Sequence, residues 1–202
     1  MRYLAFLFLL FIAIPAYAAE RESAYDRVMR TGVLRCGYLT WPRFFEIDPV
    51  SGEKSGIWHD YTMEMARQLN LSVTWSEEVG PGEFIAALDA GRIDAMCAPI
   101  ARLIPRLKGA AFTAPLAYIA VVAYVRIDDH RFDAGLDTIN DPAVRITSME
   151  GEFNAVIARM RFPKAQLIEF PVLMGASQGF VNVETGKADV IFSDALATGD
   201  YI

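Results

Sequence analysis

A short unit occurs twice in this chain and constrains its fold more than any other feature. Residues 91–98 read Gly-Arg-Ile-Asp-Ala-Met-Cys-Ala, and residues 186–193 read Gly-Lys-Ala-Asp-Val-Ile-Phe-Ser, a shift of 95 positions from 91 to 186. In each copy a glycine ends a helix-like stretch, a basic residue follows, and an aspartate precedes an apolar strand. Two such junctions predict two similar α/β lobes, and a small molecule would bind in the cleft between them.

The pattern around the two units predicts alternating strands and helices. In the first lobe we expect strands at 33–38, 71–75 and 93–98 and helices at 59–69 and 81–90. In the second lobe we expect strands at 144–148, 165–170 and 188–193 and helices at 152–161 and 176–185. An apolar stripe of Ile57, Tyr61, Met65 and Leu69 supports the first helix. A β-branched run at 118–126 carries the chain between the lobes. This alternation is typical of parallel-type sheets flanked by helices.

The N-terminal segment has the features of an export signal. Arg2 supplies a basic start, residues 4–14 form an apolar run too short to span a bilayer well, and Ala16-Tyr17-Ala18 fits a cleavage site. We expect cleavage after Ala18 and an exported protein, with an uncleaved anchor helix as the alternative.

The predicted organisation has three parts. A signal peptide covers 1–18, a first lobe with the first hinge strand covers 19–123, and a second lobe covers 124–202. The second lobe holds a single three-strand unit, so we expect this lobe and the return crossing to be incomplete, with a C-terminal portion missing.

Charge and cysteine content limit the partners and cofactors. The net charge of −6 argues against nucleic acid or an anionic membrane as a partner. Cys36 and Cys97 each lie in a strand-like run, and an exported chain can join them in a disulfide if the strands are neighbours. Two buried thiols are the alternative. His59 and His130 are far apart and have no ligand spacing, so we expect no metal and no cofactor.

Two opposite charges follow predicted strands, where open parallel sheets bind ligands. Arg106 belongs to the first lobe and Asp194 to the second. A guanidinium fits a carboxylate, and an aspartate accepts from an ammonium group. Facing each other across a cleft, the two residues would hold both ends of a zwitterion such as an amino acid. On spacing alone, a solvated surface charge is the preferred explanation of each residue.

Further motifs show that the chain resembles the periplasmic solute-binding proteins of the polar amino acid class, which feed ABC importers. The resemblance covers about 31–202. The segment 56–61 reads Gly-Ile-Trp-His-Asp-Tyr, which matches a family motif except that Trp58 replaces its first acid. Arg106 is followed by Phe-Thr-Ala-Pro at 112–115, where the family has Phe-Ser-x-Pro.

The resemblance implies a fold, a role and site residues. It implies a two-lobed periplasmic-binding-protein-like α/β fold that closes on an amino acid, a related small zwitterion or an organic acid. The protein would act in the periplasm as a monomer and deliver its ligand to an inner-membrane ABC permease. The resemblance also implies that Arg106 holds the ligand carboxylate, that Asp194 receives the ligand amine, and that Trp41 stacks on the ligand.

Two stretches depart from the family pattern and define the remaining candidates for ligand contact. The hydroxyl-bearing turn after the third strand is replaced by Ala-Pro-Ile-Ala, beginning at Ala98. The Gly-Thr-Thr pattern of the second lobe is replaced by Gly151, Glu152 and Phe153. Backbone N–H groups at this helix start could bind an anion, but Glu152 would compete for the same positive end. Arg102 is a rival to Arg106 as the anchor.

We expect a binding protein without chemistry of its own. One alternative is an enzyme resembling the cyclohexadienyl dehydratases, in which Glu152 would act as general acid because a carboxylic acid in a partly apolar cleft can have a raised pKa. The structural explanation of Glu152 is a helix-start acid stabilised by the helix dipole. Another alternative is an accessory protein of a periplasmic oxidoreductase.

Overall fold

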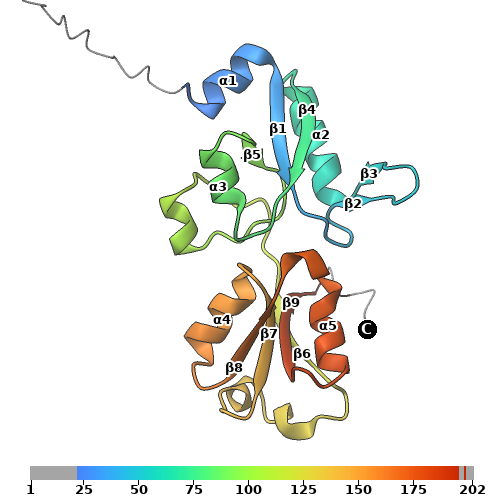
Figure 1. Cartoon of the computed structure of the whole chain (residues 1–202), viewed down its shortest axis with the longest axis vertical. Helices are drawn as coiled ribbons and strands as arrows, with labels where there is room; N and C mark the ends of the chain where they lie inside the picture. Colours follow the sequence, from blue (N-terminus) through green and yellow to red (C-terminus); the bar gives the residue numbers. More distant parts are fainter. Residues whose placement is uncertain (1–21, 196–197, 199–202) are drawn as a thin grey trace, which may run out of the picture.

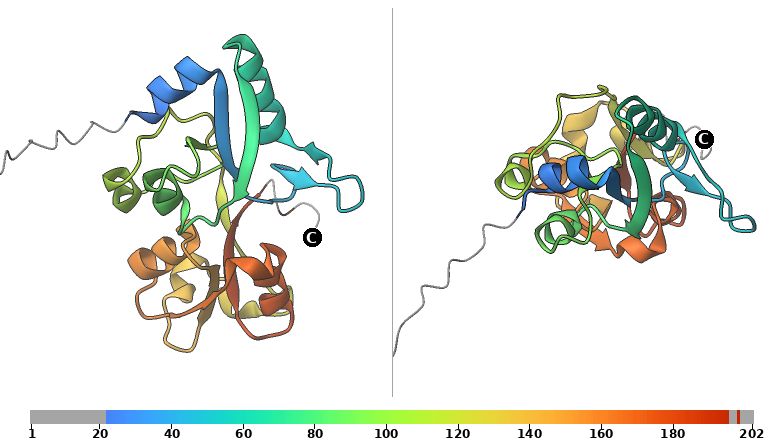
Figure 2. Two further views of the ribbon diagram at one scale, coloured as in Figure 1. Left: turned by 45° about the horizontal axis from the view of Figure 1, so that its top comes forward. Right: turned by 90° about the horizontal axis from the view of Figure 1, so that it is seen from above.

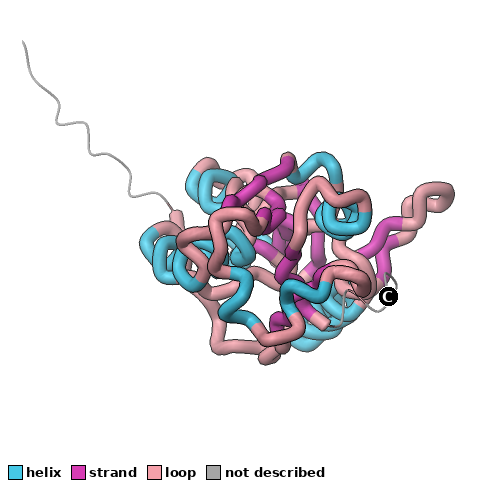
Figure 3. The backbone as a smooth tube through the Cα atoms, turned by 90° about the horizontal axis from the view of Figure 1, so that it is seen from below, coloured by secondary structure: helices cyan, strands magenta, loops and turns pink. Residues whose placement is uncertain are grey.

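The computed structural model describes residues 22–195 and residue 198, and these form two α/β lobes stacked along the long axis of the molecule (Figure 1). The predicted signal peptide and its cleavage site lie outside the described residues. Two further views show the same two bodies, with the β2–β3 hairpin projecting from the first lobe (Figure 2). Viewed from below, helices and loops surround the strands (Figure 3).

The first lobe, called lobe 1 here, is built on a three-stranded parallel sheet with the order β4-β1-β5. Its elements are α1 (Ala24–Thr31), β1 (Val33–Tyr38), β2 (Glu46–Ile47), β3 (Lys54–Ser55), α2 (Ile57–Gln68), β4 (Ser72–Glu78), α3 (Phe84–Asp89), β5 (Ala95–Met96) and the 3-10 helix η1 (Ile104–Lys108). The strand predicted at 33–38 is confirmed, whereas β5 is shorter than the predicted 93–98.

The second lobe, lobe 2, has a four-stranded sheet with the order β6-β9-β7-β8. Its elements are β6 (Val121–Val125), η2 (His130–Phe132), η3 (Leu136–Ile139), β7 (Arg145–Met149), α4 (Phe153–Arg161), β8 (Gln166–Phe170), η4 (Val172–Met174), α5 (Ser177–Glu184) and β9 (Val190–Asp194). β7 pairs in parallel with β8 and β9, while β6 runs antiparallel to β9. The expected boundary between 123 and 124 therefore falls inside a strand of this sheet.

Alternating side chains of β9 build the core of lobe 2 on both faces of its sheet. Val190 and Phe192 pack with Ala158 of α4, whereas Ile191 packs with Val183 of α5. Figure 1 accordingly shows α4 and α5 on opposite sides of the sheet. This period of two is what a strand buried between two helical layers requires.

No helix in the described ranges is long and apolar enough to cross a bilayer.

The repeated aspartate makes the same bonds in both lobes. In lobe 1, Arg35 donates its backbone N–H to Asp94 Oδ2 at 2.8 Å, and Asp94 returns its own N–H to Arg35 O at 2.8 Å. In lobe 2, Arg145 and Asp189 exchange the equivalent bonds at 2.9 and 2.8 Å. Each arginine side chain also reaches both oxygens of its aspartate. The sequence repeat is therefore a structural repeat.

The cysteines form a disulfide. β1 and β5 are neighbours, with Cys36 opposite Ala95, and the Cα atoms of Cys36 and Cys97 lie 5.4 Å apart. Of the two alternatives left by the sequence, the bridge is the one that the structure contains.

The apolar stripe of α2 is only partly its buried face, since within it Met65 packs against the core cluster of Val28, Leu34 and Cys36. Thr62 and Ala66 are the buried residues of this helix, whereas Ile57 and Leu69 are more than half exposed. The stripe correctly predicted a helix, but the small side chains of the adjacent row pack against the lobe.

Candidate site at the junction of the lobes

Arg106 connects the two lobes through its guanidinium group. Its Nη1 donates to Ala101 O at 2.9 Å, and its Nη2 donates both to Pro81 O at 3.1 Å and to Gly151 O at 2.6 Å. Gly151 belongs to lobe 2, and the other two acceptors belong to lobe 1. The carbon Cζ of Arg106 also lies 5.6 Å from the centre of the Phe84 ring, within the range of a cation–π contact.

Arg106 is buried, with 6% of its surface exposed, so the alternative of a solvated surface charge is wrong for this residue. Burial lowers the pKa of the guanidinium, and the field of Glu152 partly opposes that effect. Within the described residues, no carboxylate forms an ion pair with Arg106, and its bonds go to backbone carbonyls instead. A buried guanidinium that lacks a direct counter-ion is an uncommon arrangement and indicates a functional position.

The two lobes also approach each other closely at two glycines, Gly82 and Gly151. A Cβ atom added to Gly151 would lie 2.5 Å from the backbone nitrogen of Gly82, closer than any side chain can pack. Gly151 also has φ +77°, a left-handed conformation that favours glycine. Beside this contact, a Cβ on Gly80 would lie 3.0 Å from the Val172 side chain. The absence of a side chain at Gly151 therefore allows backbone to meet backbone across the junction.

Glu152 lies at the same junction as the N-cap of α4. It is 7% exposed, and its Oε2 accepts from the backbone N–H of Phe153 at 3.2 Å. Burial raises the pKa of the Glu152 carboxyl, Arg106 and the Phe153 N–H work in the opposite direction, and Asp194 raises the pKa further. Because Arg106 and Asp194 both act on Glu152, the structure brings the three charged candidates into one neighbourhood.

Asp194 is placed by the last residue pair of the β6–β9 ladder. It ends β9 and is paired with Val121 of β6 in antiparallel register. Asp194 is partly exposed, whereas Glu152 is buried. The end of β9 therefore places this carboxylate in the neighbourhood of Glu152.

The remaining candidates are placed by the ends of strands and helices. Ala98 follows the disulfide at the end of β5, and Phe153 opens α4 directly after Glu152. Trp41 closes a turn after β1, where its N–H bonds to Phe45 O at 2.8 Å. In the described part of the chain, no hydrogen bond or ring contact joins Trp41 to Arg106, so Trp41 and Arg106 are not brought into direct contact.

Two features of the junction were not predicted from the sequence. One is the Gly80-Pro81-Gly82 turn, which follows β4 at the same sheet edge as the other candidates and was interpreted as the start of a helix. The rule that ligands bind beyond strand ends would have selected it. The other is Asn154, a buried residue in the first turn of α4 whose Oδ1 has no hydrogen-bond partner among the described residues. A buried acceptor without a donor has no signal in the sequence.

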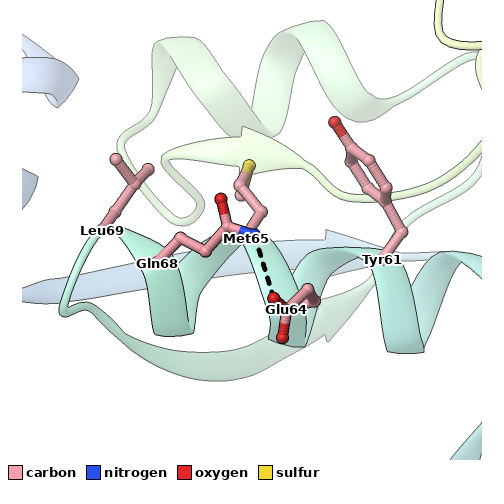
Figure 4. Close-up of a pocket in the computed structure, with 5 residues that line it drawn as sticks. All are labelled: Tyr61, Glu64, Met65, Gln68 and Leu69. Atoms are coloured by element: carbon pink, nitrogen blue, oxygen red, sulfur yellow. Dashed lines mark hydrogen bonds between the residues drawn. The ribbon is translucent and has the colours of Figure 1, made fainter.

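Two surface hollows lie on lobe 1 away from Arg106. One has a volume of about 250 Å³ and is lined by Tyr61, Glu64, Met65, Gln68 and Leu69 (Figure 4). The figure shows Gln68 bonded to Glu64 along α2, while the apolar stripe of the helix borders the hollow. The second has a volume of about 460 Å³ and lies between α1 and the segment around Phe112. Neither hollow is lined by a candidate residue from the junction.

Comparison with known proteins identifies related sequences and folds. Residues 34–167 match the family model of the bacterial extracellular solute-binding proteins, family 3. No curated protein matches the chain.

Several solved structures share the fold. An ancestral amino acid-binding protein, a precursor of cyclohexadienyl dehydratase, is 23% identical with a TM-score of 0.79, covering 89% of this chain and 78% of that one. A cysteine-binding protein from Campylobacter jejuni is 16% identical with a TM-score of 0.71, covering 86% and 68%. The arginine-bound form of a truncated ArgBP from T. maritima is 21% identical with a TM-score of 0.71, covering 87% and 80%.

Proposed function

Because the chain belongs to the bacterial extracellular solute-binding proteins, family 3, we propose that it is the periplasmic substrate-binding component of an ABC importer. Its ligand is an amino acid or a related small zwitterion or organic acid, bound at the junction of the lobes. The protein acts as a monomer and delivers the ligand to an inner-membrane permease. Three solved neighbours are described as binding an amino acid, cysteine or arginine, which supports this ligand class.

The observation that carries the proposal is the buried guanidinium of Arg106 between the lobes. A guanidinium has five N–H groups. Arg106 donates three hydrogen bonds to backbone carbonyls, which leaves two N–H groups for an oxygen of the ligand. We assign the ligand carboxylate to these donors and the ligand amine to Asp194. Trp41, Ala98, Gly151 and Phe153 complete the proposed contacts.

Ligand binding is coupled to closure of the lobes. A ligand that contacts Arg106 from lobe 1 and Asp194 from lobe 2 binds the closed arrangement better than an open one, and therefore shifts the population toward it. The contact of Gly82 with Gly151 lets the two backbones meet in that arrangement. The closed form is then the one recognised by the permease.

The first experiment replaces the proposed anchor. A thermal-shift screen against amino acids, amines and organic acids identifies a ligand, because a ligand of the native state raises the melting temperature. Arg106→Ala should weaken binding of that ligand by about 2–5 kcal/mol in calorimetry, since a desolvated carboxylate loses its partner.

The matched control is Arg102→Ala. Arg102 lies four residues before Arg106 and is exposed, so its removal should leave the affinity unchanged. Equal losses in the two variants, or unchanged affinity in Arg106→Ala, would contradict the assigned role of Arg106.

The second candidate function is an enzyme of the cyclohexadienyl dehydratase type, and Glu152 is the observation in its favour. Burial raises the pKa of this carboxyl, which suits a general acid. Incubation with prephenate and detection of the aromatic keto acid product distinguishes the two functions. Product formation that is lost in Glu152→Gln would support the enzyme, whereas no product favours the binding protein.

A further inference from the structure

We propose that Glu152 is the specificity-determining residue of the junction: a ligand carboxylate can share Arg106 with Glu152 only when the Glu152 carboxyl carries a proton. A zwitterion therefore binds with uptake of a proton, whereas the corresponding amine, which lacks the carboxylate, does not require one. This inference rests on the proposed solute-binding function and specifies how the same site chooses its ligand.

The first step is the position of Glu152. Arg106 Nη2 donates to the carbonyl of Gly151 at 2.6 Å, and Glu152 is the next residue along the chain. Glu152 is 7% exposed, so its carboxyl is removed from water at the point where the lobes meet. A ligand oxygen that takes the two remaining N–H groups of Arg106 therefore enters the immediate surroundings of a buried carboxyl.

The second step is the charge of these surroundings. Among the residues that the structure describes, the charged groups whose field reaches Glu152 are Arg106 from η1 and Asp194 from β9, and its own helix adds the Phe153 N–H. With Glu152 ionised, the three side chains together carry a net charge of −1 when Arg106 contributes +1 and each carboxylate −1. A ligand carboxylate bound to Arg106 would be a second buried carboxylate beside Glu152, which is unfavourable. Protonation of one of these two carboxylates relieves their repulsion.

The third step separates the two kinds of ligand. The ammonium group is common to an amino acid and to its decarboxylated amine, so the proposed contact with Asp194 is the same for both ligands. Only the amino acid brings a carboxylate to Arg106. An ionised Glu152 therefore disfavours the amino acid but favours the cationic amine, which gives opposite pH dependences for the members of a pair.

The experiment uses matched pairs that differ only in the α-carboxylate: L-arginine with agmatine, L-leucine with 3-methylbutylamine, and L-phenylalanine with phenethylamine. Calorimetry is run between about pH 5 and pH 8 in buffers of different ionisation enthalpy. For the amino acid, we expect uptake approaching one proton and an affinity that falls by up to about tenfold per pH unit above the titration of Glu152. For the amine, we expect a constant or rising affinity.

The variant Glu152→Gln keeps the shape of the side chain and removes its titration. It should bind the amino acid without proton uptake, with a flat pH profile, and more tightly than the unmodified protein at pH 8. The measurement of bound protons on the unmodified protein tests the inference even if this variant does not fold.

The outcomes separate the two proposals. An amino acid that binds with no proton uptake across this pH range, or a pair whose members share one pH dependence, overturns the inference and leaves solute binding intact. Failure of every pair and of organic acids to bind contradicts the solute-binding function and this inference together.

Discussion

Lobe 1 and lobe 2 use one arrangement of strands but secure it differently. In lobe 1, β1 lies between β4 and β5, and in lobe 2, β7 lies between β8 and β9. A buried aspartate before β5 or β9 binds an arginine of that central strand, Arg35 in β1 or Arg145 in β7. Asp94 forms ion pairs with Arg35 and Arg27. Asp189 forms ion pairs with Arg145, Arg131 and Arg126. β5 has two residues, whereas β9 has five.

The difference shows how a short strand can be compensated. β9 is held on one side by β7 and on the other by β6. β5 has only the two-residue pairing with β1, and the Cys36–Cys97 bridge attaches the segment that follows it. Lobe 1 therefore depends on a covalent link where lobe 2 depends on strand pairing and a larger cluster of ions.

The largest expected effect is loss of the buried aspartate in lobe 2. Asp189→Asn should lower the free energy of unfolding by about 3–5 kcal/mol, because its side chain is 2% exposed and three arginines lose their common acceptor. Asp94→Asn should cost less, since two arginines are affected. Urea unfolding followed by circular dichroism measures both losses.

Tryptophan fluorescence assigns each loss to a lobe. The three tryptophans, Trp41, Trp58 and Trp75, all lie in lobe 1. Asp94→Asn should shift the fluorescence transition, and Asp189→Asn should shift circular dichroism but not fluorescence. If both variants shift both signals equally, the lobes unfold as one unit and the comparison between them fails.

Removal of the disulfide comes next. The double variant Cys36→Ala/Cys97→Ala should destabilise lobe 1 by about 2–4 kcal/mol, because the bridge closes a long loop with a sequence separation of 61 residues. The fluorescence transition should move while the lobe 2 transition stays. Reductant should reproduce the effect in the unmodified protein and have none in the double variant, and any other pattern contradicts the assigned role of the bridge.

Acid should destabilise lobe 2 more than lobe 1. Burial alone would raise the pKa of each buried aspartate, but the bonds from arginine outweigh it and hold the pKa below its usual range, most strongly for Asp189. The folded pKa lies below the unfolded value of about 4, so this stability is present above that pH and is lost as the pH falls through the folded pKa.

The expected loss for Asp189 is on the order of 2–3 kcal/mol between about pH 5 and pH 2. Thermal melting by circular dichroism along this pH series measures it. Asp189→Asn provides the control, because its melting temperature should depend less on acid. An equal acid response of the variant and the unmodified protein would refute the assignment to Asp189.

The smallest expected effect concerns a surface ion pair. Arg159 Nη2 lies 2.6 Å from Glu169 Oε2, but the arginine side chain is 61% exposed. Arg159→Ala should therefore change the stability of lobe 2 by at most about 1 kcal/mol, and about 0.5 M salt should remove the difference. If Arg159→Ala lowered the stability as much as Asp189→Asn does, burial would not explain the difference between the Arg159–Glu169 pair and the ion pairs of Asp189.

Much of the architecture was predictable because it depends on local patterns. The repeat at Asp94 and Asp189 predicted two lobes, and the strand at 33–38 was located by its apolar run. The partners of the two aspartates were not predictable, because Arg27 and Arg131 approach from segments outside the repeat. Pairing of β1 with β5, which decides the disulfide, likewise depends on the assembled sheet.

The site was predictable only in part for the same reason. The strand-end rule selected Arg106, Glu152 and Asp194, because the carboxyl ends of strands converge whatever the details of packing. The contact between Gly82 and Gly151 depends on how two complete lobes meet, which no local pattern contains. The enzyme alternative anticipated a raised pKa for Glu152, whereas the near-complete burial of this residue depends on the assembled fold.

The contact between Gly82 and Gly151 has a mechanical consequence. In the proposed closure of the lobes, two backbones that touch without side chains would act as a rigid stop, so the movement would end at one angle. A bulky substituent at either position would act as a wedge. A variant whose lobes are held apart in this way would stay open, and it would serve as the reference state for a fluorescent biosensor built on this scaffold.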